Sequence, residues 1–161
     1  MSTHRTNVLS LVLAGGSGTR LGRLTAWRSK PALPFGAQFR TIDFPLSNCI
    51  NSGFRQIAVL TQYKSQSLIR HLTAGWGFLH RELGEYIDVW PAQQRLGERW
   101  YLGNADAVHQ NLDLVVAAAP EYVLVLSGTQ IYSLDYSLLL EEHIAAGAEL
   151  TIATVEADED D

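Results

Sequence analysis

Residue types that mark secreted, membrane or disulfide-bonded proteins are scarce in this sequence. A single cysteine, Cys49, among 161 residues excludes an intrachain disulfide and is typical of a reducing compartment. The most apolar run near the start, residues 8–14, is much shorter than the roughly 20 residues that cross a bilayer. Because this run leads directly into a glycine-rich motif, we interpret it as a strand and not as a signal peptide. We therefore expect a cytoplasmic protein with no membrane partner.

Basic residues are also few, and their distribution argues against a further class of partners. The chain has 17 Asp and Glu against 12 Lys and Arg, but five of the acidic residues lie within residues 155–161. The other 12 acidic residues balance the 12 basic ones, and a neutral body with an acidic end binds nucleic acid poorly. Five basic residues nevertheless cluster between Gly15 and Ile42, with no carboxylate among them: Arg20, Arg23, Arg28, Lys30 and Arg40. This cluster predicts an anion site or a solvated basic loop.

The distribution of apolar residues predicts an α/β fold. Four short apolar runs predict strands buried on both faces of a parallel sheet: residues 7–14, 56–61, 121–127 and 149–155. Helical patterns alternate with them over residues 45–52, 65–74, 104–119 and 135–146, and Asp135 and Gly147 bound the last one. We therefore expect a doubly wound, mostly parallel sheet in one domain over residues 7–155, with an acidic tail at 156–161. Residues 75–103 fit neither period and predict a long excursion over the ligand edge of the sheet.

The first predicted strand leads into a glycine-rich loop, Gly-Gly-Ser-Gly-Thr-Arg-Leu at residues 15–21. Glycines after a buried strand allow backbone N–H groups to approach a phosphate closely, and Arg20 can add a charge-assisted contact. The dinucleotide fingerprint would require glycine in place of Leu21 and an acidic residue in place of Gln62. The P-loop would require Gly-Lys-Ser/Thr, which occurs nowhere in the chain. The loop therefore predicts a phosphate site of another kind, and a plain glycine turn is the alternative.

The residues after this loop carry a resemblance to a known family. The segment from Gly15 to Gly53 contains Lys-Pro-Ala at 30–32, Pro-Phe-Gly at 34–36 and Phe-Arg-Thr-Ile-Asp at 39–43. It resembles the signature of the sugar-nucleotide pyrophosphorylases, and Ser-Asn-Cys-Ile-Asn-Ser-Gly at 47–53 resembles the ADP-glucose pyrophosphorylase (glucose-1-phosphate adenylyltransferase) branch. Further matching segments stand at 60–63, 68–71, 91–95 and 105–108, so the resemblance covers residues 8–155.

The resemblance implies a Rossmann-like nucleotidyltransferase sheet and a reaction of glycogen or starch biosynthesis. Its partners would be ATP and glucose 1-phosphate, its products ADP-glucose and pyrophosphate, and its cofactor Mg²⁺ bridging phosphates. Arg20 and Lys30 would be the catalytic residues, gripping the outer phosphates and neutralising the reacting phosphate. The implied nucleotide-binding residues are Leu13, Gly15, Gly16, Ser17, Gly18, Thr19, Gln94, Tyr101 and Gly103. A homo- or hetero-oligomer is also implied.

The sequence departs from the family at the end of the third predicted strand. Thr129 occupies the position at which the family has a metal-binding aspartate, and a hydroxyl is a weak ligand for Mg²⁺. The five histidines show no metal-ligand spacing, and Asp106 reads as a first-turn helix carboxylate. We therefore assign no metal ligand and expect impaired catalysis. A catalytically silent nucleotide-binding or regulatory subunit is the alternative function, whereas Leu21 and Gln62 disfavour an NAD(P) oxidoreductase.

Family members continue well beyond the residues that this chain contains. The resemblance therefore implies that the sheet is incomplete at the C-terminus of these 161 residues, and that the C-terminal β-helix domain of the family is absent from them.

Overall fold

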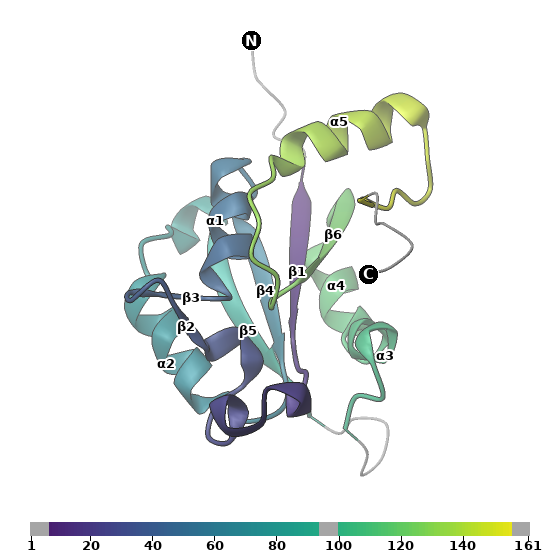
Figure 1. Cartoon of the computed structure of the whole chain (residues 1–161). Helices are drawn as coiled ribbons and strands as arrows, with labels where there is room; N and C mark the ends of the chain where they lie inside the picture. The colour runs from purple at the N-terminus through teal and green to yellow at the C-terminus, as the bar shows by residue number, and fades with distance from the viewer. Residues whose placement is uncertain (1–6, 94–99, 156–161) are drawn as a thin grey trace.

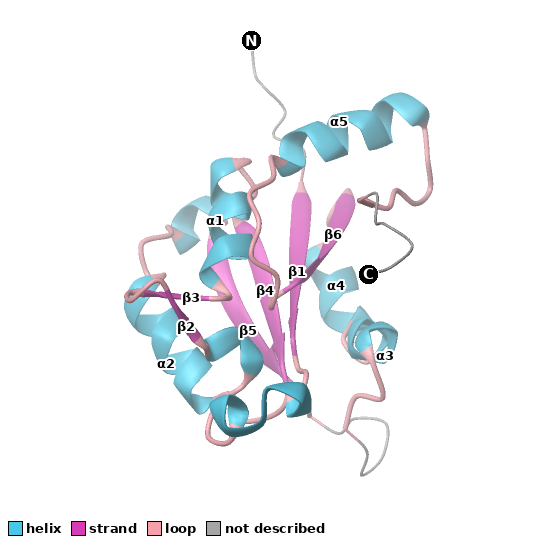
Figure 2. Ribbon diagram, in the orientation of Figure 1, coloured by secondary structure: helices cyan, strands magenta, loops and turns pink. Residues whose placement is uncertain are grey.

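The central feature of the fold is a four-stranded parallel sheet with helices on both faces (Figures 1 and 2). The computed structural model describes residues 7–93 and 100–155. The sheet has the order β5-β4-β1-β6, with strands β1 (Val8–Ala14), β4 (Gln56–Thr61), β5 (Tyr86–Pro91) and β6 (Tyr122–Ser127). The predicted α/β fold with a parallel sheet is therefore confirmed, as are the strands predicted at 7–14, 56–61 and 121–127.

Strand β1 lies in the middle of the sheet and is buried on both faces. It pairs in parallel with β4 on one side and β6 on the other, and Leu13 lies opposite Leu60 and Ser127. Val8, Leu9, Leu11 and Val12 are all buried. A strand that is buried on both faces has a nearly continuous apolar sequence, which is the pattern Val-Leu-Ser-Leu-Val-Leu-Ala shows.

Helices cover the two faces of the sheet unequally. On one face, helices α1 (Asp43–Asn51), α2 (Gln66–Gly75) and α5 (Tyr136–Ala146) supply Leu46, Leu68 and Tyr136 to the larger apolar core. On the other face, helices α3 (Asn104–His109) and α4 (Leu112–Ala118) supply Ala107 and Val115 to a smaller core against β1 and β4. The arrangement is doubly wound, as the sequence predicts.

Short elements connect the strands and helices of the sheet. The chain after β1 forms two 3₁₀ turns, Thr19–Thr25 and Lys30–Ala32, and then a small hairpin of β2 (Pro34–Phe35) and β3 (Phe39–Arg40). A third 3₁₀ turn, Arg81–Leu83, precedes β5. None of the helices in residues 7–93 and 100–155 has both the length and the apolar character needed to span a bilayer.

The strand order reverses direction at β1. The chain passes from β1 to β4 and β5 on one side, and then crosses to β6 on the other side. In open α/β sheets a ligand binds beyond the carboxyl ends of the strands at such a reversal, because the loops leave in opposite directions there and open a crevice. The residues that follow Ala14, Thr61 and Ser127 therefore occupy the expected ligand edge.

The predicted fourth strand at 149–155 is wrong. These residues form no strand, and Leu150, Ile152 and Val155 are 75%, 71% and 90% exposed. An isolated apolar run becomes a strand only where a neighbouring strand pairs with it, and the run lies beyond α5 without pairing to β6 within the described residues.

Two helical and loop predictions are also corrected. Residues 75–103 are not one long excursion, because they contain β5, which pairs in parallel with β4 at the edge of the sheet. Residues 104–119 form two helices and not one. Asn111 Nδ2 donates to the carbonyl oxygen of Ala107 at 2.8 Å, so the side chain competes with the backbone of α3 and separates it from α4.

The predicted boundaries of α5 are confirmed in atomic detail. Asp135 Oδ1 accepts hydrogen bonds from the backbone N–H and the hydroxyl of Ser137, at 2.9 and 2.7 Å. These bonds lower the pKa of the Asp135 carboxyl, because they stabilise its charged form. Gly147 ends the helix with φ 57° and ψ 32°, a left-handed conformation that glycine adopts without strain.

Candidate functional site

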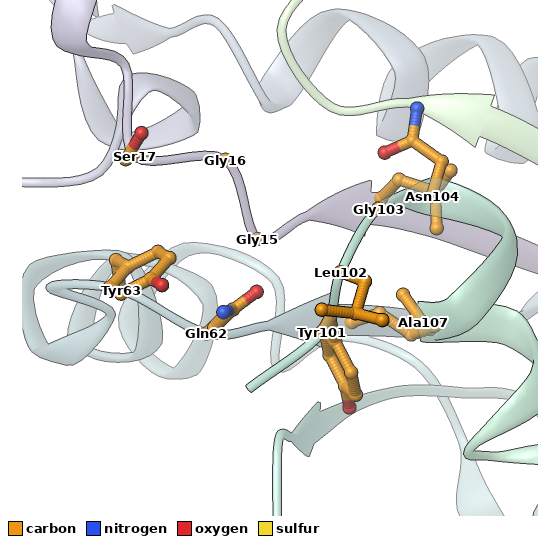
Figure 3. A pocket seen from close by; sticks show the side chains of 12 residues that line it. Gly15, Gly16, Ser17, Gln62, Tyr63, Tyr101, Leu102, Gly103, Asn104 and Ala107 are labelled. Carbon is orange, nitrogen blue, oxygen red and sulfur yellow. The ribbon is translucent and has the colours of Figure 1, made fainter. Parts of the chain in front are cut away.

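A cleft of about 210 Å³ lies at the carboxyl edge of the sheet, beside the end of β1. One wall is the loop Gly15–Ser17, and the other is the segment Tyr101–Asn104 that leads into α3 (Figure 3). Gln62 and Tyr63, which follow β4, line it between those walls. The cleft therefore combines three segments that are far apart in the sequence and that the parallel sheet brings to one edge.

The glycines of the loop differ in what surrounds them. A Cβ atom on Gly15 would lie 3.3 Å from Gln62 Cβ and 3.8 Å from Tyr101 Cδ2, so the loop backbone packs closely against the floor of the cleft. A Cβ on Gly16 would meet nothing within 4 Å, and this residue is exposed. Gly15 thus fixes the loop to the sheet, whereas Gly16 leaves the backbone open to a ligand.

Gly18 joins the loop to the turn that carries Lys30. It has φ 66° and ψ 25°, and a Cβ there would lie 2.8 Å from Thr25 Cγ2 and 3.3 Å from Lys30 Cβ. Thr25 Oγ1 donates to the Gly18 carbonyl oxygen at 2.8 Å. The left-handed backbone and the missing side chain are both required for this contact. Lys30 is therefore held directly beside the glycine-rich loop.

The opposite wall is fixed by hydrogen bonds around the start of α3. Asp106 Oδ2 accepts from the backbone N–H of Leu102 at 2.9 Å and from Gln110 Nε2 at 2.8 Å. The first-turn role predicted for Asp106 is confirmed, since the side chain reaches back to the residues before the helix. Asn111 Nδ2 donates to the Tyr101 hydroxyl at 2.9 Å and so orients that ring along the cleft wall.

Two residues after β4 present an aromatic ring and an unpaired amide. The rings of Tyr63 and Trp100 are in contact, with centroids 6.0 Å apart and an angle of 39°. Gln62 Nε2 is buried and has no hydrogen-bond partner among the described residues. A buried donor without a partner is unfavourable, so its place in the lining of a cleft indicates a ligand or water as its partner.

Arg20 and Lys30 lie outside the lining of this cleft. Arg20 is exposed on the first 3₁₀ turn, and Lys30 is half-buried at the start of the second. The Lys30 carbonyl oxygen accepts hydrogen bonds from Thr41 Oγ1 at 3.0 Å and from the Leu33 N–H at 3.1 Å. Both residues follow Ser17 along the chain, and Lys30 packs against Gly18 of the glycine-rich loop.

Thr129 lies at the same edge, two residues after β6. Its Oγ1 shares a hydrogen bond of 3.1 Å with Ser127 Oγ. The preceding residue must be glycine, because a Cβ on Gly128 would lie 2.9 Å from the Leu13 carbonyl oxygen and 3.0 Å from Ile42 Cδ1. Over residues 7–93 and 100–155, no three His, Cys, Asp or Glu side chains come together as a metal site. At position 129 itself the side chain offers a hydroxyl, which is a weak ligand for a hard cation such as Mg²⁺.

The structure brings most of the predicted nucleotide-binding residues into one place. Six line the cleft: Leu13, Gly15, Gly16, Ser17, Tyr101 and Gly103. Gly18 and Thr19 follow along the same loop without lining it, and Gln94 lies outside the described residues.

Sequence reasoning missed part of the cleft, notably Gln62, Tyr63 and Asn104. Residues that follow neighbouring parallel strands meet at one edge, so the position of Gln62 directly after β4 was the available signal for it.

Comparison with known proteins places the chain among relatives of similar sequence. A family model described as nucleotidyl transferase matches residues 9–161. A glucose-1-phosphate adenylyltransferase of Methylococcus capsulatus is 60% identical over 148 residues, which cover 92% of this chain and 35% of that protein. The protein of the same name from Teredinibacter turnerae is 55% identical over 150 residues, covering 93% and 36%. The chain therefore spans about a third of the length of these curated relatives.

A solved structure supports the fold independently. A Bacillus anthracis protein named as a glucose-1-phosphate thymidylyltransferase, crystallised with sucrose, aligns with a TM-score of 0.67 at 23% identity. The alignment covers 86% of this chain and 50% of that one. At this identity the likeness describes the fold and nothing more specific.

Replacing Gly18 with alanine tests the packing between the loop and Lys30. Gly147→Ala is the matched control, because Gly147 has the same left-handed backbone and open space around it. We expect Gly147→Ala to lower the free energy of unfolding by roughly 1–2 kcal/mol from backbone strain alone. Gly18→Ala should lose about 1–3 kcal/mol more, because the new methyl group overlaps Thr25. Urea denaturation of both variants measures the difference, and equal losses would contradict the close packing.

Proposed function

This chain belongs to the nucleotidyl transferase family, and we propose that it forms the ATP-binding part of a glucose-1-phosphate adenylyltransferase. The observation that carries this proposal is the position of the loop Gly15–Ser17 at the carboxyl end of β1, where the strand order reverses and a cleft opens. The relatives named as glucose-1-phosphate adenylyltransferases support the choice of adenine and of glucose 1-phosphate.

The cleft would bind the nucleotide lengthwise. The base would lie between Gly15 and the Tyr101–Asn104 segment, where Gln62 Nε2 offers a donor that has no partner among the described residues. The triphosphate would follow the loop from Gly16 toward Gly18. The open backbone at Gly16 suits close approach by phosphate, and the left-handed turn at Gly18 directs the loop toward Lys30. Arg20 and Lys30 would then meet the outer and the reacting phosphates, because Arg20 follows the loop directly and Lys30 packs against Gly18. Gln94 was predicted to face the base and stays a prediction.

The proposed reaction is an in-line displacement at the α-phosphorus of ATP. A phosphate oxygen of glucose 1-phosphate forms the new P–O bond, and the bond to the bridging oxygen of the β-phosphate breaks. ADP-glucose forms, and pyrophosphate leaves with the bonding electron pair. The chain's own contribution would be positioning and charge neutralisation by the loop, Arg20 and Lys30.

One specific observation favours a second candidate function. Nucleotidyl transferases generally use a divalent metal, yet Thr129 offers a hydroxyl that already bonds to Ser127 Oγ. A neutral hydroxyl holds a hard cation weakly in comparison with a carboxylate. A chain with this substitution could bind ATP as a silent subunit of an oligomer without turning it over. We propose Mg²⁺ as the cation of the family reaction.

Removing single charges from the loop tests the proposed phosphate contacts. We expect Arg20→Met and Lys30→Met each to weaken ATP binding about tenfold or more in calorimetric titrations, because each removes a charge-assisted contact to phosphate. Arg23→Met is the matched control, since Arg23 is exposed on the same 3₁₀ turn as Arg20. An equal loss in all three variants would indicate a general charge effect and contradict the assigned roles.

Restoring a carboxylate at position 129 tests the account of the metal. We expect Thr129→Asp to increase the ratio of ATP affinity with Mg²⁺ to ATP affinity without it by about tenfold, because a carboxylate is a preferred ligand of this cation. Thr129→Asn has the same shape without the charge and should leave the ratio near that of the unaltered chain. No change in Thr129→Asp would show that position 129 lies away from the bound phosphates.

A further inference from the structure

A buried carboxylate outside the cleft joins four segments near Lys30. The Asp43 side chain, at the first residue of α1, is 7% exposed. Its Oδ2 accepts from the Arg40 backbone N–H at 2.7 Å. Its Oδ1 accepts from Trp76 Nε1 at 2.9 Å and lies 2.7 Å from His71 Nε2, which donates to it. One carboxylate thus ties together the β2–β3 hairpin, the start of α1, helix α2 and the residue after it.

The segment that Asp43 holds is bonded in turn to the Lys30 turn. Arg40 Nη1 donates to the carbonyl oxygens of Ala32 at 3.3 Å and of Ser67 at 3.1 Å. Thr41 Oγ1 donates to the Lys30 carbonyl oxygen at 3.0 Å. The backbone N–H of Ile42 donates to the Pro31 carbonyl oxygen at 3.1 Å. Residues 40–42 therefore fix the backbone of every residue from 30 to 32.

Other positive charges act on Arg40, whose backbone N–H bonds to this carboxylate. Arg40 lies within electrostatic range of Arg28 and Arg70 as well as Asp43, and burial followed by the field of Arg28 lowers the pKa of its guanidinium. Between Gly15 and Ile42 the sequence holds no carboxylate at all. Asp43 is therefore the first acidic residue after the basic loop, and its charge acts on Arg40 in the opposite sense to the charges of Arg28 and Arg70.

We propose that Asp43 is a positioning residue that fixes Lys30 against the phosphates of a bound nucleotide, acting through Arg40 and Thr41. This inference rests on the proposed function, in which Lys30 neutralises the reacting phosphate. Asp43 lies outside the lining of the cleft and acts through its neighbours. It holds the Arg40–Ile42 segment, that segment holds the Lys30–Ala32 turn, and Gly18 packs the turn against the phosphate loop.

An amide cannot replace this carboxylate. The backbone N–H of Arg40 and the indole N–H of Trp76 are both donors, and they approach different oxygens of Asp43. The amide of Asp43→Asn has one oxygen and one NH₂ group, so in either orientation an NH₂ group faces a donor. A buried donor that loses its acceptor raises the free energy of the conformation that buries it. The variant should therefore release the Arg40–Ile42 segment, although the volume of the side chain hardly changes.

The test compares a ligand that has phosphates with one that has none. Calorimetry on the 161-residue chain measures the affinities for ATP and for adenosine, whose only contacts would lie in the Tyr101–Asn104 part of the cleft. We expect Asp43→Asn to weaken ATP binding about tenfold and to change adenosine binding less than about twofold, so the affinity ratio falls. Asp88→Asn is the matched control, because Asp88 lies on β5, is paired with Arg81 and stands outside the cleft. This variant should leave both affinities unchanged.

A second variant covers the case in which Asp43→Asn fails to fold. Thr41→Val removes only the hydrogen bond to the Lys30 carbonyl oxygen and keeps the shape of the side chain, and it should lower the same ratio.

The inference is overturned if both affinities fall in proportion, which would indicate a purely structural role, or if the ratio stays unchanged in both variants. If the unaltered chain binds ATP no better than adenosine, the proposed function fails first, and the inference fails with it.

Discussion

The parallel pairing of β1 with strands on both sides is the constraint on which the rest of the structure depends. Because β4 and β6 run in the same direction as β1, their last residues end at the same edge as Ala14. Gly15, Gln62 and Gly128 follow these ends and are therefore brought together without any direct signal between them in the sequence. Because β1 is buried on both faces, any substitution that weakened it would disturb all three segments at once.

Close packing and hydrogen bonds connect the sheet to the basic residues. Gly15 is packed against Gln62, Gly18 is packed against Lys30, and the Lys30 turn is bonded to residues 41 and 42, which lead into α1. Few of these contacts involve long side chains, so the loop is shaped mainly by glycines and by carbonyl acceptors. Such a loop leaves its own N–H groups available for a ligand, which is the property that a phosphate site requires.

The sequence predicts the parts of this fold that depend on local pattern. The run Val8–Ala14, the cap at Asp135 and the glycine at 147 are determined by residues close to one another, and all three are confirmed. Strand β5 was missed because its half-buried Tyr, Trp and Asp residues lack a clear period, and pairing with β4 decides its conformation. The strand predicted at 149–155 shows the opposite case. Its apolar pattern suits a strand, but none of the described strands pairs with it. Gln62 could be found only by placing the strand ends at one edge, and Asn104 only by knowing that the start of α3 packs beside that edge.

The central claim is that a nucleotide binds along the loop after β1, with its base toward Tyr101–Asn104. Mapping amide chemical shifts of the ¹⁵N-labelled chain during an ATP titration tests it most directly. We expect shifts at Gly15, Gly16, Gly18 and Gly103, with Gly53 and Gly84 unchanged, because the last two line a cavity at the opposite ends of the strands. Shifts confined to Gly53 and Gly84, or saturation with ATP that leaves the loop glycines unmoved, would contradict it.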